Sequence, residues 1–287
     1  MPSDRTRELY KALQEKGYPD EFCREIAYKY IQRFQVVRMW GRINLHWADL
    51  NNDVNILVGI NGSGKTTLLN LIHDYYTGQK TKKEIAESLS GNAISSPVTY
   101  IRSFDIPANA KKKTESILLQ DLKNIINQNG EGTSFFDYRM KMLNFPQEAD
   151  KIRKRIETYF QVVNSFLGET NKEISIDPQS NSLVFLIKRL EGMQVITEDK
   201  IQLEQLSSGE KQILLILTTV FLQEEKPNVL LMDEPEISLH IGWQDKLIEK
   251  LRLLNPQCQL ILTTHSPNIF VNGWEDKIIF IEDLEDR

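Results

Sequence analysis

The most informative stretch of this chain is Gly59-Ile60-Asn61-Gly62-Ser63-Gly64-Lys65-Thr66. It matches the pattern G-x-x-x-x-G-K-[ST] at every fixed position. An apolar run at 54–58 precedes it as an expected strand, and residues 67–72 continue it as an expected helix. Glycines let backbone amides curl around an anion, and the positive end of the following helix favours negative charge. The stretch therefore predicts a phosphate-binding loop between a strand and a helix.

The pattern also assigns roles within this loop. Lys65 is expected to reach the β- and γ-phosphates of a nucleotide, while the Thr66 hydroxyl holds Mg²⁺. The predicted nucleotide-binding residues are Asn61, Gly62, Ser63, Gly64, Lys65, Thr66 and Thr67. A chance match is expected in roughly 1% of chains of this length. The flanking strand and helix lower that chance further.

A second apolar run, 228–232, ends in two carboxylates, Asp233 and Glu234. Strands buried on both faces of a parallel sheet have this composition, and open α/β sheets bind ligands at the carboxyl ends of their strands. We expect Asp233 to bind Mg²⁺, directly or through water, opposite Thr66. Glu234 is placed to orient and deprotonate the attacking water. Many strands end in an acidic turn, so this signal is weak alone and strong beside the loop.

Helices and strands alternate through the last third of the sequence. The predicted elements are a helix at 209–224, a strand at 228–233, a helix at 243–254 and strands at 259–264 and 277–281. Such spacing predicts a mostly parallel sheet with helices on its faces. Residues 113–170 have a charged helical pattern and 174–203 a pattern of short strands. We expect a helical appendage at 1–33 and one α/β domain at 34–287, with a helical insertion at about 113–170.

Composition narrows the class of protein. Hydrophobic residues make up 40% of the chain and charged residues 26%, as in ordinary soluble proteins. The net charge of −5 shows no global basic excess, although a local basic face stays compatible with it. Cys23 and Cys258 have no metal-like spacing, and the longest apolar stretch, 213–222, is too short to span a bilayer. We expect a cytoplasmic protein with no membrane partner.

The helix predicted at 209–224 opens with Leu206-Ser207-Ser208-Gly209-Glu210. One interpretation is structural, because Ser207 with Glu210 three residues later forms a capping box. The stretch also resembles the signature of the ABC superfamily, L-S-G-G-Q or, in SMC-like heads, L-S-x-G-E. That resemblance implies that Ser208 and Gly209 bind the γ-phosphate held by the opposite subunit, supported by Leu206. Both interpretations can hold together.

The strand predicted at 259–264 is followed by His265. A lone histidine is more often structural than catalytic, but this position matches the switch histidine of ABC ATPases, which contacts the γ-phosphate. The resemblance implies an ATPase that uses ATP and Mg²⁺, with Lys65, Glu234 and His265 as catalytic residues. It implies an α/β fold of the ABC/SMC head type, with a mixed, mostly parallel sheet, a helical lobe and a short N-terminal helical appendage.

Several details distinguish branches of this superfamily. Glu210 replaces the glutamine usual in transporters, and residues 234–244 lack the S-A-L-D loop of transporters. They resemble instead the E-P-E-x-x-L-H-P-x-W-Q pattern of the AAA-type ATPases found with overcoming-lysogenization nucleases and in Septu, retron and related phage-defence systems, with Ile241 in place of the proline. No Q-loop glutamine follows the strand predicted at 98–101, where Arg102 stands. The 206 − 64 = 142 positions from Gly64 to Leu206 suit a short lobe rather than coiled-coil arms, and no fused nuclease is expected after the last strand.

The resemblance implies heads that associate on ATP and separate on hydrolysis. Lys65 and Thr66 of one head then face Ser208 and Gly209 of the other, in a homodimer or higher oligomer. The expected partner is a separately encoded effector such as a nuclease or toxin. A RecF-like DNA-repair ATPase and a transporter nucleotide-binding subunit are the alternatives, and the loop around Leu239-His240 counts against the transporter.

Three groups of basic residues leave DNA open as a partner. They are Lys80, Lys82 and Lys83; Lys111, Lys112 and Lys113; and Lys151, Arg153, Lys154 and Arg155. Each group could contact phosphates. Each could equally be a solvated face, because acidic residues are interspersed among the basic ones.

Overall fold

The computed structural model describes residues 15–19, 28–103, 116–127, 134–180, 182–191 and 194–286. The chain forms two compact units. The first unit comprises residues 1–103, 226–236 and 257–287, and the second comprises 104–225 and 237–256.

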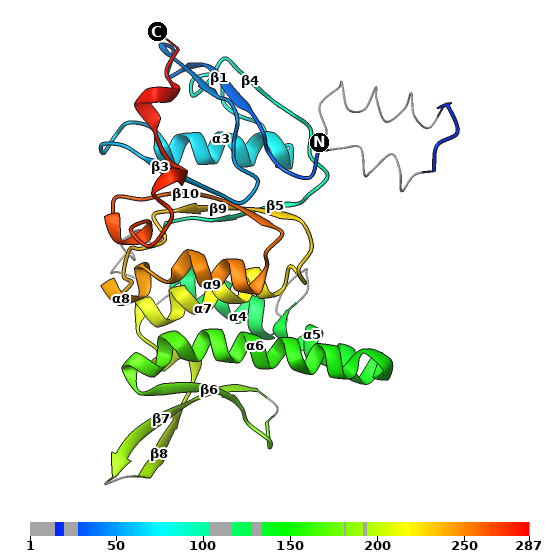
Figure 1. Ribbon diagram of the computed structural model, residues 1–287, viewed down its shortest axis with the longest axis vertical. Coiled ribbons are helices and arrows are strands. Elements are labelled where there is room, and N and C mark those ends of the chain that lie inside the picture. The colour runs from blue at the N-terminus through cyan, green and yellow to red at the C-terminus, as the bar shows by residue number, and fades with distance from the viewer. Residues whose placement is uncertain are drawn as a thin grey trace. The chain divides into compact units, whose positions relative to one another are not determined.

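A five-stranded parallel sheet forms the centre of the first unit (Figure 1). Its strand order is β11 (Ile278–Phe280), β3 (Val54–Val58), β10 (Cys258–Thr263), β9 (Asn228–Asp233) and β5 (Val98–Ile101). Every residue of β9 and β10 is buried, which explains their nearly continuous apolar sequence. The register pairs Thr263 of β10 with Asp233 on one side and Leu57 on the other. The three central strands therefore end at the same edge.

Helix α3 (Lys65–Thr77) lies between this sheet and a smaller antiparallel one (Figure 1). The smaller sheet has the order β2 (Ile43–Trp47), β1 (Phe34–Met39) and β4 (Ser88–Gly91). Leu68, Leu69 and Ile72 of the helix are buried in the core that joins the two sheets. The sandwiched helix thus fixes the position of the loop at its N-terminus.

Two buried amide side chains anchor the segment that enters β1. The Gln259 side chain accepts a hydrogen bond from the Ile31 backbone N–H at 2.9 Å and donates to the Ile31 and Asn51 carbonyls at 2.8 and 2.7 Å. The Asn92 side chain accepts from the Gln32 N–H at 2.8 Å and donates to the Tyr30 carbonyl at 2.9 Å. These bonds satisfy backbone groups that the strands leave unpaired.

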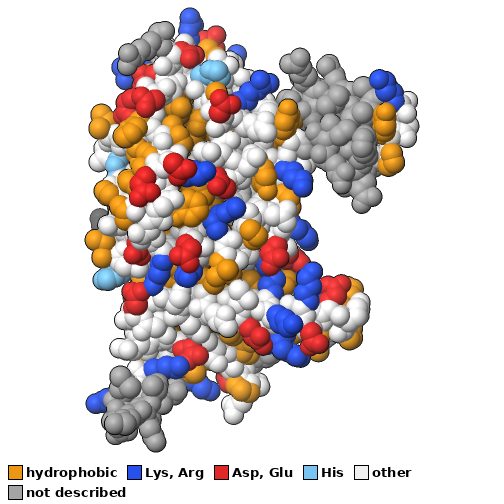
Figure 2. All heavy atoms as spheres, viewed as in Figure 1, with side chains coloured by type: hydrophobic (Ala, Val, Ile, Leu, Met, Phe, Trp, Pro, Cys, Tyr) orange, Lys and Arg blue, Asp and Glu red, His pale blue; other side chains and the backbone are white. Residues whose placement is uncertain are grey.

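The second unit is mainly helical. Its helices are α4 (Ile117–Asn127), α5 (Phe135–Asn144), α6 (Ala149–Leu167), α7 (Ser208–Phe221), α8 (Ile241–Gln244) and α9 (Leu247–Leu254). An antiparallel sheet of β6 (Lys172–Ile176), β7 (Leu183–Glu191) and β8 (Gln194–Ile201) completes it. Helix α7 contacts α4, α6 and α9, so it is the centre of this unit. Over the exposed end of α6, basic and acidic side chains are intermingled (Figure 2).

Aromatic side chains pack around the end of α7. The rings of Tyr159 and Phe221 have centroids 4.6 Å apart, and Phe135 and Tyr138 also pack against Phe221. The Tyr159 hydroxyl is paired with the Thr218 hydroxyl at 2.7 Å, which satisfies both buried groups. The Arg155 guanidinium lies over the Phe221 ring and donates to the Phe221 carbonyl at 2.7 Å.

Most of the predicted elements are present. The strands expected at 54–58, 98–101 and 228–233 have those bounds, and helices occupy the 113–170 interval where the structure describes it. The mostly parallel sheet is confirmed, with both antiparallel sheets separate from it. Most of residues 1–33 lie outside the described ranges, so the helical appendage and its boundary stay predictions.

Two elements differ from expectation. The sequence Ser-Leu-Ser-Gly forms β4, an edge strand that pairs with β1 through its backbone and has little intrinsic strand preference. The helix expected at 243–254 is instead the two helices α8 and α9. At this break the Lys246 ammonium donates to the Ser165 carbonyl of α6 at 2.7 Å.

Candidate functional site

The glycine-rich loop connects β3 to α3, as the sequence predicts. Gly62 and Gly64 have φ angles of 81° and 102°, in the left-handed region that side chains rarely adopt. A Cβ atom at Gly64 would also lie 2.8 Å from Met39 Cε and 3.0 Å from the Trp40 ring. Glycine is therefore required at this point both by the backbone and by its neighbours.

Lys65 is buried at the first position of α3. Its ammonium donates to the carbonyls of Gly59 and Ile60 at 2.9 and 3.1 Å. Burial lowers the pKa of Lys65, and the negative charges of Glu234 and Asp233 oppose that shift. The hydroxyl of Ser63 is buried and has no hydrogen-bond partner among the described residues. The loop thus presents a desolvated cation and an unsatisfied hydroxyl.

The Asp233 carboxylate joins the loop to the end of the sheet. Its Oδ1 accepts from the Thr66 hydroxyl at 3.0 Å and from the Thr263 hydroxyl at 2.7 Å. Thr66 is on α3, Asp233 ends β9 and Thr263 ends β10. The two residues predicted to hold a metal ion are therefore in direct contact.

Glu234 leaves the strand with a left-handed φ of 47°. Its backbone N–H donates to the Thr263 hydroxyl at 3.0 Å, and its Oε1 lies 3.2 Å from His265 Nε2. Burial and the adjacent Asp233 charge raise the pKa of Glu234, and the His265 ring opposes that shift. The side chains of Glu234 and His265 retain 26% and 37% exposure, so both remain accessible to a ligand.

The sequence did not assign a role to Glu236, which is only 8% exposed. Its Oε1 accepts from the Thr264 hydroxyl at 2.6 Å and from the His265 backbone N–H at 2.8 Å. Its Oε2 is buried and has no partner among the described residues. The second glutamate of the Glu-Pro-Glu stretch thus holds the backbone that carries His265. The sequence did contain a signal for this role, because Glu236 lies three positions after Asp233, where the buried strand β9 ends.

The sequence also assigned no role to Trp40. Trp40 lies in the tight turn between β1 and β2 with a φ of 53°, followed by Gly41 at 77°. Its ring lies against Gly64 and remains 38% exposed. An exposed aromatic face therefore borders the glycine-rich loop, and only the tertiary structure reveals it.

In the segment after β5, where a Q-loop glutamine would be expected, the structure describes Arg102 and Ser103. Arg102 follows β5, is exposed, and places its guanidinium 5.6 Å from the centre of the Tyr100 ring. The described segment ends at Ser103.

The stretch 206–210 lies in the second unit and begins α7. The capping box is present, because the Ser207 hydroxyl accepts from the Glu210 N–H and Glu210 Oε2 accepts from the Ser207 N–H at 2.8 Å. Glu210 is 1% exposed, and its Oε1 accepts from the Lys172 ammonium and the Thr170 hydroxyl, both at 2.7 Å. These bonds hold the pKa of Glu210 below its ordinary value despite burial. Leu206 is also buried, whereas Ser208 is exposed.

Gly209 has a structural role within its own chain. A Cβ atom at this position would lie 2.3 Å from the Ser238 carbonyl oxygen, which is closer than atoms can approach. Ser238 itself has a left-handed φ of 70°. The glycine thus lets the start of α7 pack against the segment that follows the Glu-Pro-Glu stretch.

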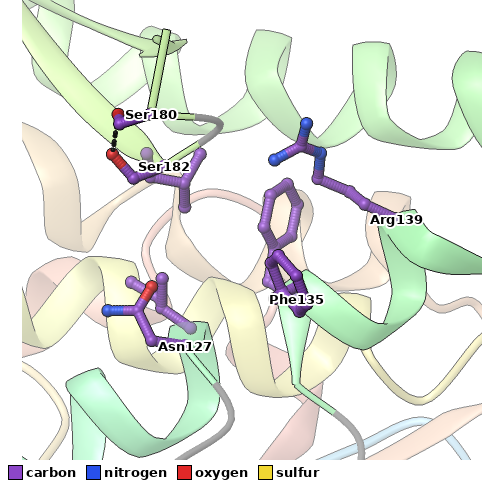
Figure 3. A pocket seen from close by; sticks show the side chains of 8 residues that line it. Asn127, Phe135, Arg139, Ser180 and Ser182 are labelled. Carbon is purple, nitrogen blue, oxygen red and sulfur yellow. Dashed lines mark hydrogen bonds between the residues drawn. The ribbon is translucent and has the colours of Figure 1, made fainter. Parts of the chain in front are cut away.

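The predicted site residues therefore form two groups. The loop residues, Asp233, Glu234 and His265 gather in the first unit, whereas 206–210 form a capped helix start in the second. The second unit also has a pocket of about 270 Å³ lined by Asn127, Phe135, Arg139, Ser180 and Ser182, among others (Figure 3). The Ser180 and Ser182 hydroxyls are paired there at 2.7 Å. No predicted site residue lines this pocket.

Comparison with known proteins identifies relatives of the chain. The Septu protein PtuA of Bacillus thuringiensis is 22% identical over 80% of this chain and 70% of its own length. The retron Ec83 probable ATPase of Escherichia coli is 27% identical over 62% of this chain and 34% of its own length. Among solved structures, an SmcHead bound to the C-winged helix domain of ScpA superposes with a TM-score of 0.51 at 15% identity, over 88% of this chain and 94% of that one. This likeness confirms the expected fold.

Among the described residues, every helix is too short or too polar to cross a bilayer. A family model described as "AAA domain, putative AbiEii toxin, Type IV TA system" matches residues 118–272. The match spans more than half of the chain and includes the signature stretch, the acidic pair and His265. The chain therefore belongs to this AAA-domain family of P-loop ATPases, related to the Septu and retron ATPases.

Proposed function

We propose that this protein binds ATP with Mg²⁺ and hydrolyses ATP between two engaged heads, and that the resulting change controls a separately encoded effector. The observation that supports it most directly is the contact of Thr66 with Asp233 beside the Glu234–His265 pair. Thr66 from the loop meets the strand-end carboxylate of Asp233 there. The Glu234–His265 pair and the buried Lys65 lie beside them. Nucleotide-hydrolysing sites need this combination of charge and geometry.

The residues around the loop fit ATP and Mg²⁺. Thr66 Oγ1 and Asp233 Oδ1 are hydrogen-bonded at 3.0 Å, and both are hard oxygen donors of the kind that would hold Mg²⁺. No cluster of three or more histidine, cysteine or acidic residues that could hold a metal occurs in the described part of the chain. Mg²⁺ binds through one or two protein oxygens together with substrate phosphates. When bound, Mg²⁺ neutralises charge on the phosphates.

We assign the remaining chemistry to residues of the first unit. Asn61, Gly62, Ser63, Gly64 and Thr67 line the phosphates with Lys65, which neutralises the β- and γ-phosphates. Glu234 orients and deprotonates the attacking water, and His265 contacts the γ-phosphate from the neighbouring strand end. The raised pKa of Glu234 suits a group that accepts a proton and then releases it.

The signature stretch completes the site in trans in this proposal. Ser208 is exposed at the N-terminus of α7, where backbone N–H groups favour an anion. Ser207, Gly209 and Glu210 hold this helix start in place through the capping box and the close contact with Ser238. Each ATP would then be bound by the loop of one head and the α7 N-terminus of the other. Nucleotide state thereby sets dimer geometry, which a partner can recognise.

Replacing Glu234 by glutamine tests the hydrolysis and engagement model. The amide cannot accept the proton, so we expect hydrolysis to fall by about 10²- to 10⁴-fold while ATP still binds. Gel filtration should then show an ATP-dependent dimer or larger species that separates when ATP is removed. A Glu234→Gln protein that stays monomeric at saturating ATP would contradict head engagement.

Ser208→Arg tests the trans assignment. An arginine at the exposed helix start replaces the hydroxyl proposed to contact the γ-phosphate of a facing head and leaves the loop of its own chain unchanged, so hydrolysis should be lost and binding of a fluorescent ATP analogue retained. Mixing this variant with Lys65→Ala should restore part of the activity, because one composite site is then intact. Loss of nucleotide binding in Ser208→Arg would place Ser208 in the pocket of its own chain.

Glu236 is proposed as a positioning residue for His265. Glu236→Ala removes both acceptor bonds, and we expect kcat to fall by about 10- to 100-fold with little change in KM. Glu236→Gln keeps an oxygen for Thr264 and His265 N, so it should recover most of the rate. Glu249→Ala, at a largely exposed carboxylate of α9, is the control. If glutamine is as damaging as alanine, the charge of Glu236 matters and not the bonds.

The cellular role rests on relatives, since the chain resembles ATPases named for the Septu and retron systems. We propose an anti-phage role in which the effector is a nuclease or toxin encoded beside this protein. Tagged wild-type protein and tagged Glu234→Gln protein should both co-purify with the neighbouring gene product. The amount recovered should differ between them, because Glu234→Gln is expected to hold ATP and the wild type to hydrolyse it. Co-purification with a permease, or with replication proteins alone, would contradict this role.

A further inference from the structure

The three basic groups of the sequence differ once the fold is known. Lys80, Lys82 and Lys83 lie in the loop between α3 and β4, and all three are exposed. The group at 111–113 lies outside the described residues. The third group lies along α6.

The α6 group is neutralised by acids. Arg153 pairs with Asp150 at 3.0 Å, and Arg155 pairs with Glu225. Lys151, Arg153, Lys154 and Arg155 supply four positive charges, against four negative charges from Glu148, Asp150, Glu157 and Glu225, so the sum is 4 − 4 = 0. Figure 2 shows both signs intermingled over this end of α6. This surface is a solvated helix face, as one of the two interpretations held.

The lysine loop, in contrast, gains positive charge from the fold. The Trp40 N–H donates to the Ile85 carbonyl at 2.8 Å, and the Glu87 N–H donates to the Val37 carbonyl at 2.9 Å. These bonds join the loop at 78–87 to the β1–β2 turn at 38–42, which carries Arg38 and Arg42. Both arginines are exposed; Arg38 pairs with Glu87 at 3.0 Å, whereas no ion pair is recorded for Arg42 among the described residues.

We call the five side chains of Arg38, Arg42, Lys80, Lys82 and Lys83 the basic rim. The two joined segments also contain Glu84 and Glu87, so their net charge is 5 − 2 = +3. The whole chain has a net charge of −5, which leaves −5 − 3 = −8 for everything else. A positive patch on an acidic protein is therefore built by contacts between segments about 40 residues apart in the chain.

The basic rim adjoins the nucleotide loop. Trp40 lies in the same turn as Arg38 and Arg42, and its ring contacts Gly64 at the start of α3. The left-handed φ angles of Arg38, Trp40 and Gly41, at 49°, 53° and 77°, fix the shape of this turn. A ligand bound to the rim would therefore contact the β1–β2 turn, which packs against the glycine-rich loop.

We propose that the basic rim binds the phosphate backbone of duplex DNA. Exposed lysines and arginines on flexible stems suit a repeating phosphate polyanion, where each contact releases condensed counterions. A membrane surface is disfavoured, because Trp40 is the only large exposed apolar side chain within the two joined segments. DNA binding by the basic rim does not require ATP hydrolysis. The bound DNA would lie beside the glycine-rich loop, because the rim adjoins that loop.

Fluorescence anisotropy with a labelled DNA duplex of about 30 base pairs tests this proposal on the full chain without nucleotide. The variant carries Lys80→Glu, Lys82→Glu and Lys83→Glu. Its affinity should fall at least about tenfold, and the slope of log K against log salt should shrink by about 2.7, or 0.9 for each lost phosphate contact. The ATPase rate without DNA should match that of the wild type, since none of these lysines touches the loop.

The matched control carries Lys151→Glu, Arg153→Glu and Lys154→Glu, which alters the charge by the same 3 × (−2) = −6. It should keep the wild-type affinity within about threefold. Thermal melting shows whether each variant is folded. If the variant with three glutamates at 80, 82 and 83 is unfolded, a variant with Lys80→Gln, Lys82→Gln and Lys83→Gln takes its place. Equal losses in both triple variants, no binding by the wild type, or competition by polyglutamate as effective as by unlabelled DNA would each overturn the proposal.

Discussion

The parallel pairing of β10 with β9 and β3 is the constraint on which the candidate site depends. It brings Thr263 level with Asp233 and Leu57, so the glycine-rich loop, the acidic pair and His265 all leave the sheet at one edge. Thr263 then contacts both acidic residues, through its hydrogen bonds to the Asp233 carboxylate and the Glu234 N–H. A one-residue slip in this register would separate Asp233 and Glu234 from the histidine.

Charge is concentrated at this edge, where Lys65, Asp233 and Glu236 are buried and Glu234 and His265 remain partly exposed. Lys65 lies near Glu234, Asp233, Glu282 and Glu236, and these carboxylates oppose the effect of burial on its pKa. The carboxylates differ in their partners. Asp233 accepts two hydroxyl bonds, and Glu236 accepts a hydroxyl and a backbone N–H, whereas the Glu234 side chain faces His265. Burial and the Asp233 charge raise the pKa of Glu234, which is the direction that the proposed proton transfer needs.

The signature stretch illustrates how structure and function share residues. Ser207 and Glu210 cap α7, and Glu210 also ties that helix to β6 through Lys172. Gly209 is needed because the Ser238 carbonyl leaves no room for a side chain. Ser238 lies four positions after Glu234, so the segment that leaves the acidic pair packs against the helix that bears Ser208.

The sequence by itself determined the loop, the acidic pair, the strand bounds at 54–58 and 228–233, and the family resemblance, because these depend on local patterns of glycine, charge and hydrophobicity. It did not reveal β4, whose residues have little intrinsic strand preference, or the break between α8 and α9. Glu236 and Trp40 were missed because burial against Thr264 and contact with Gly64 arise from distant segments. The same holds for the basic groups. Their sequences look alike, and only the tertiary structure decided that one is neutralised on α6 while another gains two arginines, since charge balance depends on neighbours in space rather than along the chain.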